Sequence, residues 1–235
     1  PNNPRVVLAD NLKSIFDTGK LKKLIFMDTS SLIFESKHTP RIYPPNEHCI
    51  TTCKIARGAN KVMARLISAG FQAFLVGGSV RDLLLERNPI DFDVATNATP
   101  TQIASIFRRS RLIGRRFKLV HVRENSELIE VATFRKSPEH SHGADNTRII
   151  FRDNDFGRIE DDVIRRDYTL NALYLDYATL NIFDFVGGMQ DLNDGVLRLI
   201  GDPEARFGED PVRVLRAVRF SESLNFKIAG FTDTQ

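Results

Sequence analysis

Two aspartates separated by a single residue, Asp91 and Asp93, are the side chains of this sequence best suited to chemistry. The surrounding segment, Ile90 to Val94, alternates apolar and acidic residues, which predicts a β-strand. Alternate residues of a strand share a face, so both carboxylates would point one way while Ile90, Phe92 and Val94 enter the core. Carboxylates about 7 Å apart repel each other unless a cation lies between them. Two Mg²⁺ ions would suit this pair and support phosphoryl transfer; two solvated aspartates on an edge strand are the alternative.

A glycine-rich turn precedes these aspartates. Leu75 and Val76 end an apolar run that leads into Gly77, Gly78 and Ser79 and then into a predicted helix. Glycines allow backbone N–H groups to close around a phosphate, and the start of a helix adds partial positive charge. Arg81, in the first turn of that helix, could reach the same anion. An ordinary strand-to-helix turn is the alternative, and the aspartate pair that follows favours the phosphate site.

A third acidic residue, Glu130, lies in the otherwise apolar run Leu128 to Ala132. A charged residue inside such a strand needs a partner. We expect Glu130 to be a third carboxylate of the same site, with an exposed edge residue as the alternative.

The elements that must position these groups follow from hydrophobic periodicity, caps and turns. The helix at 55–69 has an apolar face of Ala59, Val62, Met63 and Leu66 and ends at Gly70, and Thr99 with Gln102 predicts a capped helix start. Residues 137–162 are polar and predict a mobile surface loop. The other predicted elements are strands at 73–76, 92–95, 173–176 and 181–185, helices at 79–86 and 210–224, and a hairpin of strands 117–122 and 128–134.

In combination, Gly77-Gly78-Ser79-x-Arg81-Asp82 followed by Asp91-Phe92-Asp93 resembles the signature of the DNA polymerase β-like nucleotidyltransferases. It most resembles their class II branch, which contains bacterial CCA-adding enzymes and bacterial poly(A) polymerases. Later segments agree with this branch in order and spacing: Arg165-Arg166-Asp167-Tyr168-Thr169-Leu170-Asn171-Ala172, Asp184-x-x-Gly187-Gly188-x-x-Asp191-Leu192, and Glu209-Asp210-x-x-Arg213-x-x-Arg216.

The resemblance implies an α/β fold: a nucleotidyltransferase head, with a small mixed sheet and helices, followed by the start of an all-α neck. We expect an N-terminal extension and linker at 1–54, the catalytic head at 55–200 and the beginning of the neck at 201–235. The stripe Val212, Leu215 and Val218 on the last helix has no obvious cover in the sequence, which favours a truncated neck.

The same resemblance assigns roles to individual positions. Asp91 and Asp93 would be the metal ligands, with Glu130 as the third catalytic carboxylate. The triphosphate and ribose would be held by Gly77, Gly78, Ser79, Arg81, Arg166, Asp167 and Asn171. For Arg165 and Arg166, a solvated pair at a helix start is the alternative.

The helix motif Glu209, Asp210, Arg213 and Arg216 would bind the base. A carboxylate accepts from the amino group of adenine or cytosine, and a guanidinium donates to the adjacent ring nitrogen. Asp210 with Arg213 would therefore accept A or C and reject G or U, without separating A from C. Asp210-Pro211 is also a good helix cap.

A basic segment bears on the choice between the two activities of the branch. The stretch Leu112 to Val122 resembles the poly(A) polymerase form of this motif. Residues 108–118 contain six basic residues and no acidic one, which favours phosphate contacts, with Arg115 and Arg116 as candidates. For Arg108, Arg109 and Arg111, a solvated basic face is the alternative.

Composition agrees with a soluble protein and an anionic partner: the net charge is +3 and the pI about 9.0. Two cysteines, Cys49 and Cys53, favour reduced thiols and a cytoplasmic location, and no stretch predicts a membrane span. The resemblance thus implies addition of AMP from ATP to RNA 3′ ends with two Mg²⁺ ions. The alternatives are a CCA-adding enzyme acting on tRNA and a non-catalytic fragment that binds RNA or nucleotide.

Overall fold

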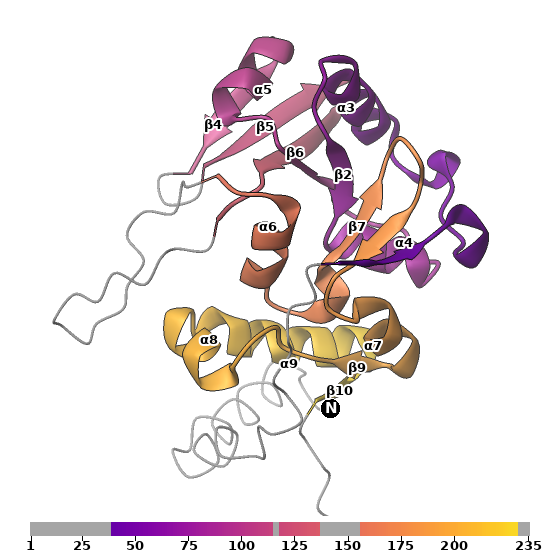
Figure 1. Cartoon of the computed structure of the whole chain (residues 1–235), viewed down its shortest axis with the longest axis vertical. Coiled ribbons are helices and arrows are strands. Elements are labelled where there is room, and N and C mark those ends of the chain that lie inside the picture. Colours follow the sequence, from indigo (N-terminus) through magenta and orange to yellow (C-terminus); the bar gives the residue numbers. More distant parts are fainter. Residues whose placement is uncertain (1–38, 115–117, 137–155, 230–235) are drawn as a thin grey trace, which may run out of the picture.

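The computed structural model describes residues 39–114, 118–136 and 156–229, and an eight-stranded sheet lies at its centre (Figure 1). Neighbouring strands of this sheet run antiparallel except β3 and β6, which run parallel. The mixed sheet predicted from the sequence is therefore confirmed. In spatial order the strands are β1 (Arg41–Tyr43), β8 (Ile182–Asp184), β7 (Leu173–Asp176), β2 (Ala73–Val76), β3 (Asp93–Thr96), β6 (Glu127–Thr133), β5 (Leu119–Glu124) and β4 (Ser110–Ile113).

Helices cover both faces of the sheet. Helix α3 packs on β2, β3, β5 and β6, and α5 packs beside it on β4, β5 and β6, whereas Val163 of α6 is buried in a second apolar cluster that includes Phe74 and Tyr174. In Figure 1, α7, α8 and α9 lie at the opposite end of the molecule from α3 and α5. The helices are α3 (Arg57–Ser68), α4 (Gly78–Leu84), α5 (Pro100–Ile106), α6 (Ile159–Arg165), α7 (Gly188–Asp194), α8 (Pro203–Glu209) and α9 (Val212–Leu224).

The strongest local signals predicted their elements well. The predicted apolar face of α3 is completely buried, and Gly70 follows the helix with a φ of +85° that favours glycine. Thr99 and Gln102 form the predicted capping box at the start of α5. Short elements complete the chain: η2 (Pro45–Glu47), η3 (Thr52–Lys54), η4 (Thr169–Asn171) and the parallel pair β9 (Val196–Leu197) and β10 (Lys227–Ile228).

Two predicted connections differ in the structure. Part of the predicted N-terminal extension and linker at 1–54 forms β1, which pairs with β8 at the edge of the sheet. Residues 137–155 of the predicted polar loop lie outside the described residues, but Ile159–Arg165 is a helix rather than loop. Hydrophobic periodicity could not reveal this helix because Val163 is its single buried residue. Three acidic residues in its first turn stabilise it instead.

Helix α9 has two apolar stripes. Of the stripe predicted to lack cover, Val212 and Leu215 are 55% and 46% exposed, whereas Val218 is partly buried. A second stripe, which the sequence analysis did not separate, consists of Ala217, Phe220 and Leu224 and is buried in the main core. The helix is therefore packed against the head along one side. The division of the chain at residues 54 and 200 stays a prediction. No described helix is long and apolar enough to cross a bilayer.

The motif Asp184-x-x-Gly187-Gly188-x-x-Asp191 stabilises the backbone near the centre of the molecule. The buried Asp184 carboxylate accepts hydrogen bonds from the N–H groups of Val186, Gly188 and Met189, at 2.9–3.1 Å. Asp191 accepts a 2.6 Å hydrogen bond from the Thr169 hydroxyl. Helix α7 is thus fixed against η4, the short segment that carries Asn171.

Replacing Gly188 by alanine should destabilise the protein, because the new Cβ would overlap the backbone carbonyl of Thr169. We expect the free energy of unfolding to fall by roughly 1–3 kcal/mol. Gly208→Ala is the matched control, since Gly208 lies in α8 with no atom within 4 Å of such a Cβ. That change should raise stability by about 0.5–1 kcal/mol. Urea denaturation of both variants measures this, and equal effects would contradict the assigned contact.

Candidate active site

One row of side chains crosses the sheet and contains two of the three acidic residues predicted to be catalytic. Asp93 of β3 is the register partner of Glu130 of β6, and Glu130 is the partner of His121 of β5. Register partners project their side chains from the same face. The row continues to Arg111 of β4 on one side and to Val76, Tyr174, Phe183 and Ile42 on the other.

Asp91 lies outside the strand, and this corrects part of the sequence analysis. Strand β3 begins at Asp93, Ile90 is 94% exposed, and Phe92 is only partly buried. The cause is Gly77, whose φ of +76° turns the chain away directly after Val76, the partner of Asp93. Strand β2 therefore ends before it could pair with residues 91 and 92. Asp91 and Asp93 are therefore separated by one residue in the chain, but they are not alternate residues of one strand.

Negative charge at Asp93 is unfavourable as the protein stands. Burial, and then the nearby carboxylate of Glu130, raise the pKa of Asp93 to about 6, although Arg166 opposes the shift and Asp91 adds to it. Glu130 is exposed, although β6 lies inside the sheet and not at its edge, and His121 Nε2 lies 3.1 Å from its Oε1. Within the described residues, no three acidic, histidine or cysteine side chains are placed so that they could hold a metal ion as they stand.

The glycine turn lies directly beside Asp93. A Cβ on Gly77 would be 3.7 Å from both Asp93 Oδ2 and Arg166 Nη1, so the backbone, the carboxylate and the guanidinium meet there. Gly78 begins α4, and the Ser79 hydroxyl donates to the Val76 carbonyl, 3.0 Å away. Ser79 is 2% exposed. The Ser79 hydroxyl, one of the groups in this turn predicted to bind phosphate, therefore already has a hydrogen-bond partner within the protein.

Arg166 is fixed beside this turn by two residues that the sequence analysis missed. Its Nε donates to the Tyr174 hydroxyl at 2.6 Å and its Nη2 to Asp162 Oδ2 at 3.1 Å, while Tyr174 donates to the same Asp162 oxygen at 2.6 Å. Burial alone would lower the pKa of Arg166, but Tyr174 and Asp162 raise it. Arg165 is the last residue of α6 and Arg166 follows it as the C-cap, and both are partly buried, so they are not a solvated pair at a helix start. The four-residue spacing of Asp162 and Arg166 was the one signal in the sequence that could have revealed this ion pair.

A chain of hydrogen bonds links helix α4 to helix α9. Arg81 Nη1 donates to Asn171 Oδ1 at 2.8 Å, and Asn171 Nδ2 donates to Asp167 Oδ1 at 3.3 Å. The other oxygen of Asp167 accepts a 2.6 Å bond from Arg216 Nε. Four predicted nucleotide-binding residues from three separate motifs are thus connected directly.

The predicted base-reading residues form a second group. Arg213 Nη1 contacts Glu209 Oε2 at 3.1 Å, whereas Asp210 Oδ1 accepts from the Val212 N–H at 3.1 Å in the turn between α8 and α9, where Pro211 is the N-cap residue of α9. The acidic partner of Arg213 in the structure is therefore Glu209, and among the described residues no ion pair joins Arg213 to Asp210. Arg206, which the sequence analysis missed, donates to Glu209 and to the carbonyls of Arg165 and Arg166.

Positive charge is concentrated around this second group. Burial, and then the guanidiniums of Arg135, Arg206 and Arg213, together lower the pKa of Arg165 to about 10, with Glu209 opposing them. Such a cluster favours an anion nearby. The two candidates Arg115 and Arg116 lie outside the described residues.

Comparison with known proteins identifies the family. The profile of the poly(A) polymerase head domain matches residues 73–198, so the chain belongs to this family of the class II nucleotidyltransferases. It is 52% identical over 197 residues to poly(A) polymerase I of Salmonella typhi, and 38% identical over 175 residues to the CCA-adding enzyme of Staphylococcus haemolyticus. These matches cover 80% and 74% of this chain and 42% of each relative.

A solved structure agrees with this assignment. The Bacillus stearothermophilus CCA-adding enzyme in complex with CTP matches with a TM-score of 0.64 and 34% identity, covering 74% of this chain and 40% of that chain. The chain thus spans about two fifths of the length of the proteins it matches.

Asp93→Asn should stabilise the metal-free protein, most strongly above pH 6. The raised pKa of Asp93 means that its neutral form favours folding fully below about pH 4 and that this contribution is lost as pH rises through about 6. The gain at pH 7.5 should be at most about 3 kcal/mol, and partial exposure will reduce it. Thermal unfolding in EDTA at pH 4 and pH 7.5 measures it.

Asp91→Asn is the matched control for this change, because Asp91 is exposed and is the smallest of the causes that raise the pKa of Asp93, so its removal should stabilise the protein much less at pH 7.5. A stabilisation of the Asp93 variant that is the same at both pH values would contradict the assigned cause.

Proposed function

We propose that this chain is the nucleotide-adding part of an enzyme that transfers AMP from ATP to RNA 3′ ends without a template and releases pyrophosphate. The observation that carries the proposal is the register of β3 with β6, which places Asp93 beside Glu130 and next to the Gly77 turn. An acidic pair beside a glycine turn and a fixed guanidinium suits the transfer of a nucleotidyl group.

The acidic residues fit Mg²⁺ by their chemistry. Mg²⁺ prefers oxygen ligands, and the raised pKa of Asp93 shows that its charge lacks compensation. Asp91 and Asp93 would hold the metal, with Glu130 as the third carboxylate. Bound Mg²⁺ would lower the pKa of the RNA 3′-hydroxyl and offset negative charge on the departing pyrophosphate.

The protein's own residues would position the substrate. Arg166, held by Tyr174 and Asp162, presents its Nη1 next to Gly77, where the triphosphate would lie against the backbone N–H groups of Gly78 and Ser79. Arg81 and Asn171 would complete the contacts to phosphate and ribose, and Asp167 would tie them to Arg216. Because these groups are already ordered by hydrogen bonds, little reorganisation would accompany the reaction.

Base selection would fall to Asp210 and Arg213, with Glu209 and Arg206 as their supports. Arg213 would have to exchange its bond to Glu209 for one to a ring nitrogen of the base. Its neighbours would keep it close, since Glu209 is itself held by Arg206 at 2.8 Å.

Addition of CCA to tRNA is the second candidate, and the matched structure with bound CTP favours it. Higher identity to a poly(A) polymerase I than to a CCA-adding enzyme supports AMP addition instead. We also propose a cytoplasmic location, supported by Cys49 and Cys53, which are both free thiols.

Separate incubations with ATP, CTP, GTP and UTP test the proposed reaction. Full-length protein containing this chain should extend an unstructured RNA with ATP and Mg²⁺, and should not restore CCA to a tRNA that lacks its 3′ end when given CTP and then ATP. Asp93→Ala should reduce the incorporation of AMP at least 1000-fold, because rate losses of about this size follow the removal of a key catalytic group. Sequential C and A addition would establish the second candidate, and an active Asp93→Ala protein would contradict both.

Arg213→Ala should loosen base choice more than it weakens triphosphate binding, because the Gly77 turn and Arg166 are unaffected. We expect the preference for ATP over GTP to fall by roughly 10- to 100-fold, the effect of about 1.4–3 kcal/mol. Arg219→Ala is the control, since Arg219 is exposed on the same helix. The ratio of kcat/KM values for ATP and GTP measures the change. Unchanged ratios would mean that Arg213 serves only to pack the neck.

A further inference from the structure

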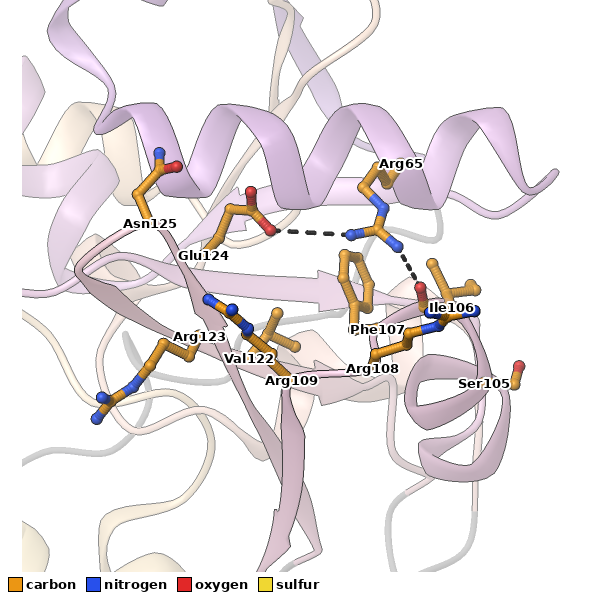
Figure 2. Close-up of a pocket in the computed structure, with 10 residues that line it drawn as sticks. All are labelled: Arg65, Ser105, Ile106, Phe107, Arg108, Arg109, Val122, Arg123, Glu124 and Asn125. Carbon is orange, nitrogen blue, oxygen red and sulfur yellow. Dashed lines mark hydrogen bonds and ion pairs between the residues drawn. The ribbon is translucent and has the colours of Figure 1, made fainter.

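A basic hollow lies at the β4–β5 edge of the sheet, at the end of β5 (Figure 2). It has a volume of about 380 Å³. Three elements contribute arginines to its lining: Arg65 from α3, Arg108 and Arg109 from the connection between α5 and β4, and Arg123 from β5. The sequence analysis noted Arg108 and Arg109 but had no reason to join them to Arg65 or Arg123.

The acidic residue of the hollow is already used. Glu124 lies 3.8 Å from Arg65 Nη1 and 3.4 Å from Lys61 Nζ. Arg65 also lies over the Phe107 ring and donates to the Ile106 carbonyl, as Figure 2 shows. Arg108, Arg109 and Arg123 are exposed, and none forms an ion pair with another residue of the described part of the chain.

The backbones of two of these arginines, Arg109 and Arg123, are paired, and their side chains extend in different directions in Figure 2. The Arg123 N–H donates to the Arg109 carbonyl at 2.9 Å, which continues the β4–β5 ladder by one position. Like charges directly opposite each other on neighbouring strands are destabilising. An anion bound between them would remove this repulsion.

The same strands connect the hollow to the acidic centre. Arg123 lies two residues beyond His121 on β5, and its register partner Leu128 lies two residues before Glu130 on β6. Alternate residues share a face, so Arg123 and Leu128 project on the same side as His121 and Glu130, about 7 Å further along the strands. Leu128 is 50% exposed, which is unusual for a large apolar residue so close to a polar centre.

We propose that Leu128, Arg123 and Arg109 form a track for the RNA strand behind its 3′ end. A base would pack on Leu128, and the following phosphates would bind Arg123 and Arg109 at the hollow. The inference rests on the proposed function, because it takes the 3′-hydroxyl to lie at Asp93 and Glu130.

The sequence of chemistries favours a nucleic-acid strand over other anions. Leu128, Arg123 and Arg109 lie in one row across β6, β5 and the residue before β4, about 7 Å along the strands from the acidic centre. An apolar platform beside two cations suits the bases and phosphates that alternate along RNA. A free nucleotide would need its base and phosphates close together in one enclosed site, whereas the three arginines here are exposed. An acidic protein segment would gain no favourable contact from a surface that leads to the carboxylate of Glu130.

The test compares Arg109→Ala/Arg123→Ala with Arg41→Ala/Lys54→Ala, a control with the same charge change on the opposite part of the molecule. Arg41 and Lys54 are exposed and lie on β1 and in η3. Affinity for a fluorescent single-stranded RNA is measured as a function of KCl concentration, without ATP. Loss of two phosphate contacts should reduce the slope of log K against log salt by about 1.4 in the track variant. The control variant should change the slope less.

Steady-state incorporation completes the test. The track variant should show a roughly 10-fold higher KM for a long RNA, equivalent to about 1.4 kcal/mol, with an unchanged KM for ATP. Leu128→Ala should weaken binding of single-stranded RNA and leave double-stranded RNA unaffected, since bases in a duplex cannot stack on it. Equal slopes for the track and control variants would overturn the proposal, as would an equal loss of affinity for polyglutamate.

The two proposals fail separately. A wild-type protein that binds RNA with the predicted salt slope but incorporates no nucleotide would contradict the proposed function. A wild-type protein that incorporates AMP while the track variant keeps its RNA affinity would contradict the track.

Discussion

The parallel pairing of β3 with β6 is the constraint on which the candidate site depends. It sets Asp93 directly beside Glu130 in a row where Val76 and Tyr174 exclude water on one side and His121 and Arg111 supply basic groups on the other. A shift of this register by one residue would move every side chain of the row to the other face of the sheet. The raised pKa of Asp93 reflects the cost of holding two carboxylates together in partial burial.

Polar contacts rather than apolar packing fix the remaining groups around this pair. Arg166 depends on Asp162 and Tyr174, and Asp167 connects the residues that would bind the triphosphate to the helix that would read the base. Buried networks of this kind are stable only when every member has a partner. The buried Asp184 and Asp191 also act through polar contacts. Asp184 holds the turn that begins α7, and Asp191 holds η4.

Sequence patterns predicted the elements with strong local signals, and they failed where distant contacts decide the structure. The stripe of α3, the capping box of α5 and the strands β2 and β7 follow from periodicity and caps. Helix α6 has one buried residue and was missed, and Ile90 was placed in the core although Gly77 removes the strand that would have paired there. Motif spacing named Asp93, Glu130, Arg166 and Asn171, but of their supports only Asp162 had a signal in the sequence, and Tyr174 and Arg206 could be found only from the folded chain.

The anchoring of α8 has a consequence for how the sequence can diverge. Arg206 holds the end of α6 through the carbonyl oxygens of Arg165 and Arg166, and not through their side chains. Every amino acid offers the same carbonyl, so this contact survives any substitution at those two positions that leaves the backbone path intact. The contact made by Arg206 therefore places no demand on the side chains at residues 165 and 166, and it adds a sequence-independent link to the Asp167–Arg216 bond and the buried stripe of α9 that also join these helices to the sheet.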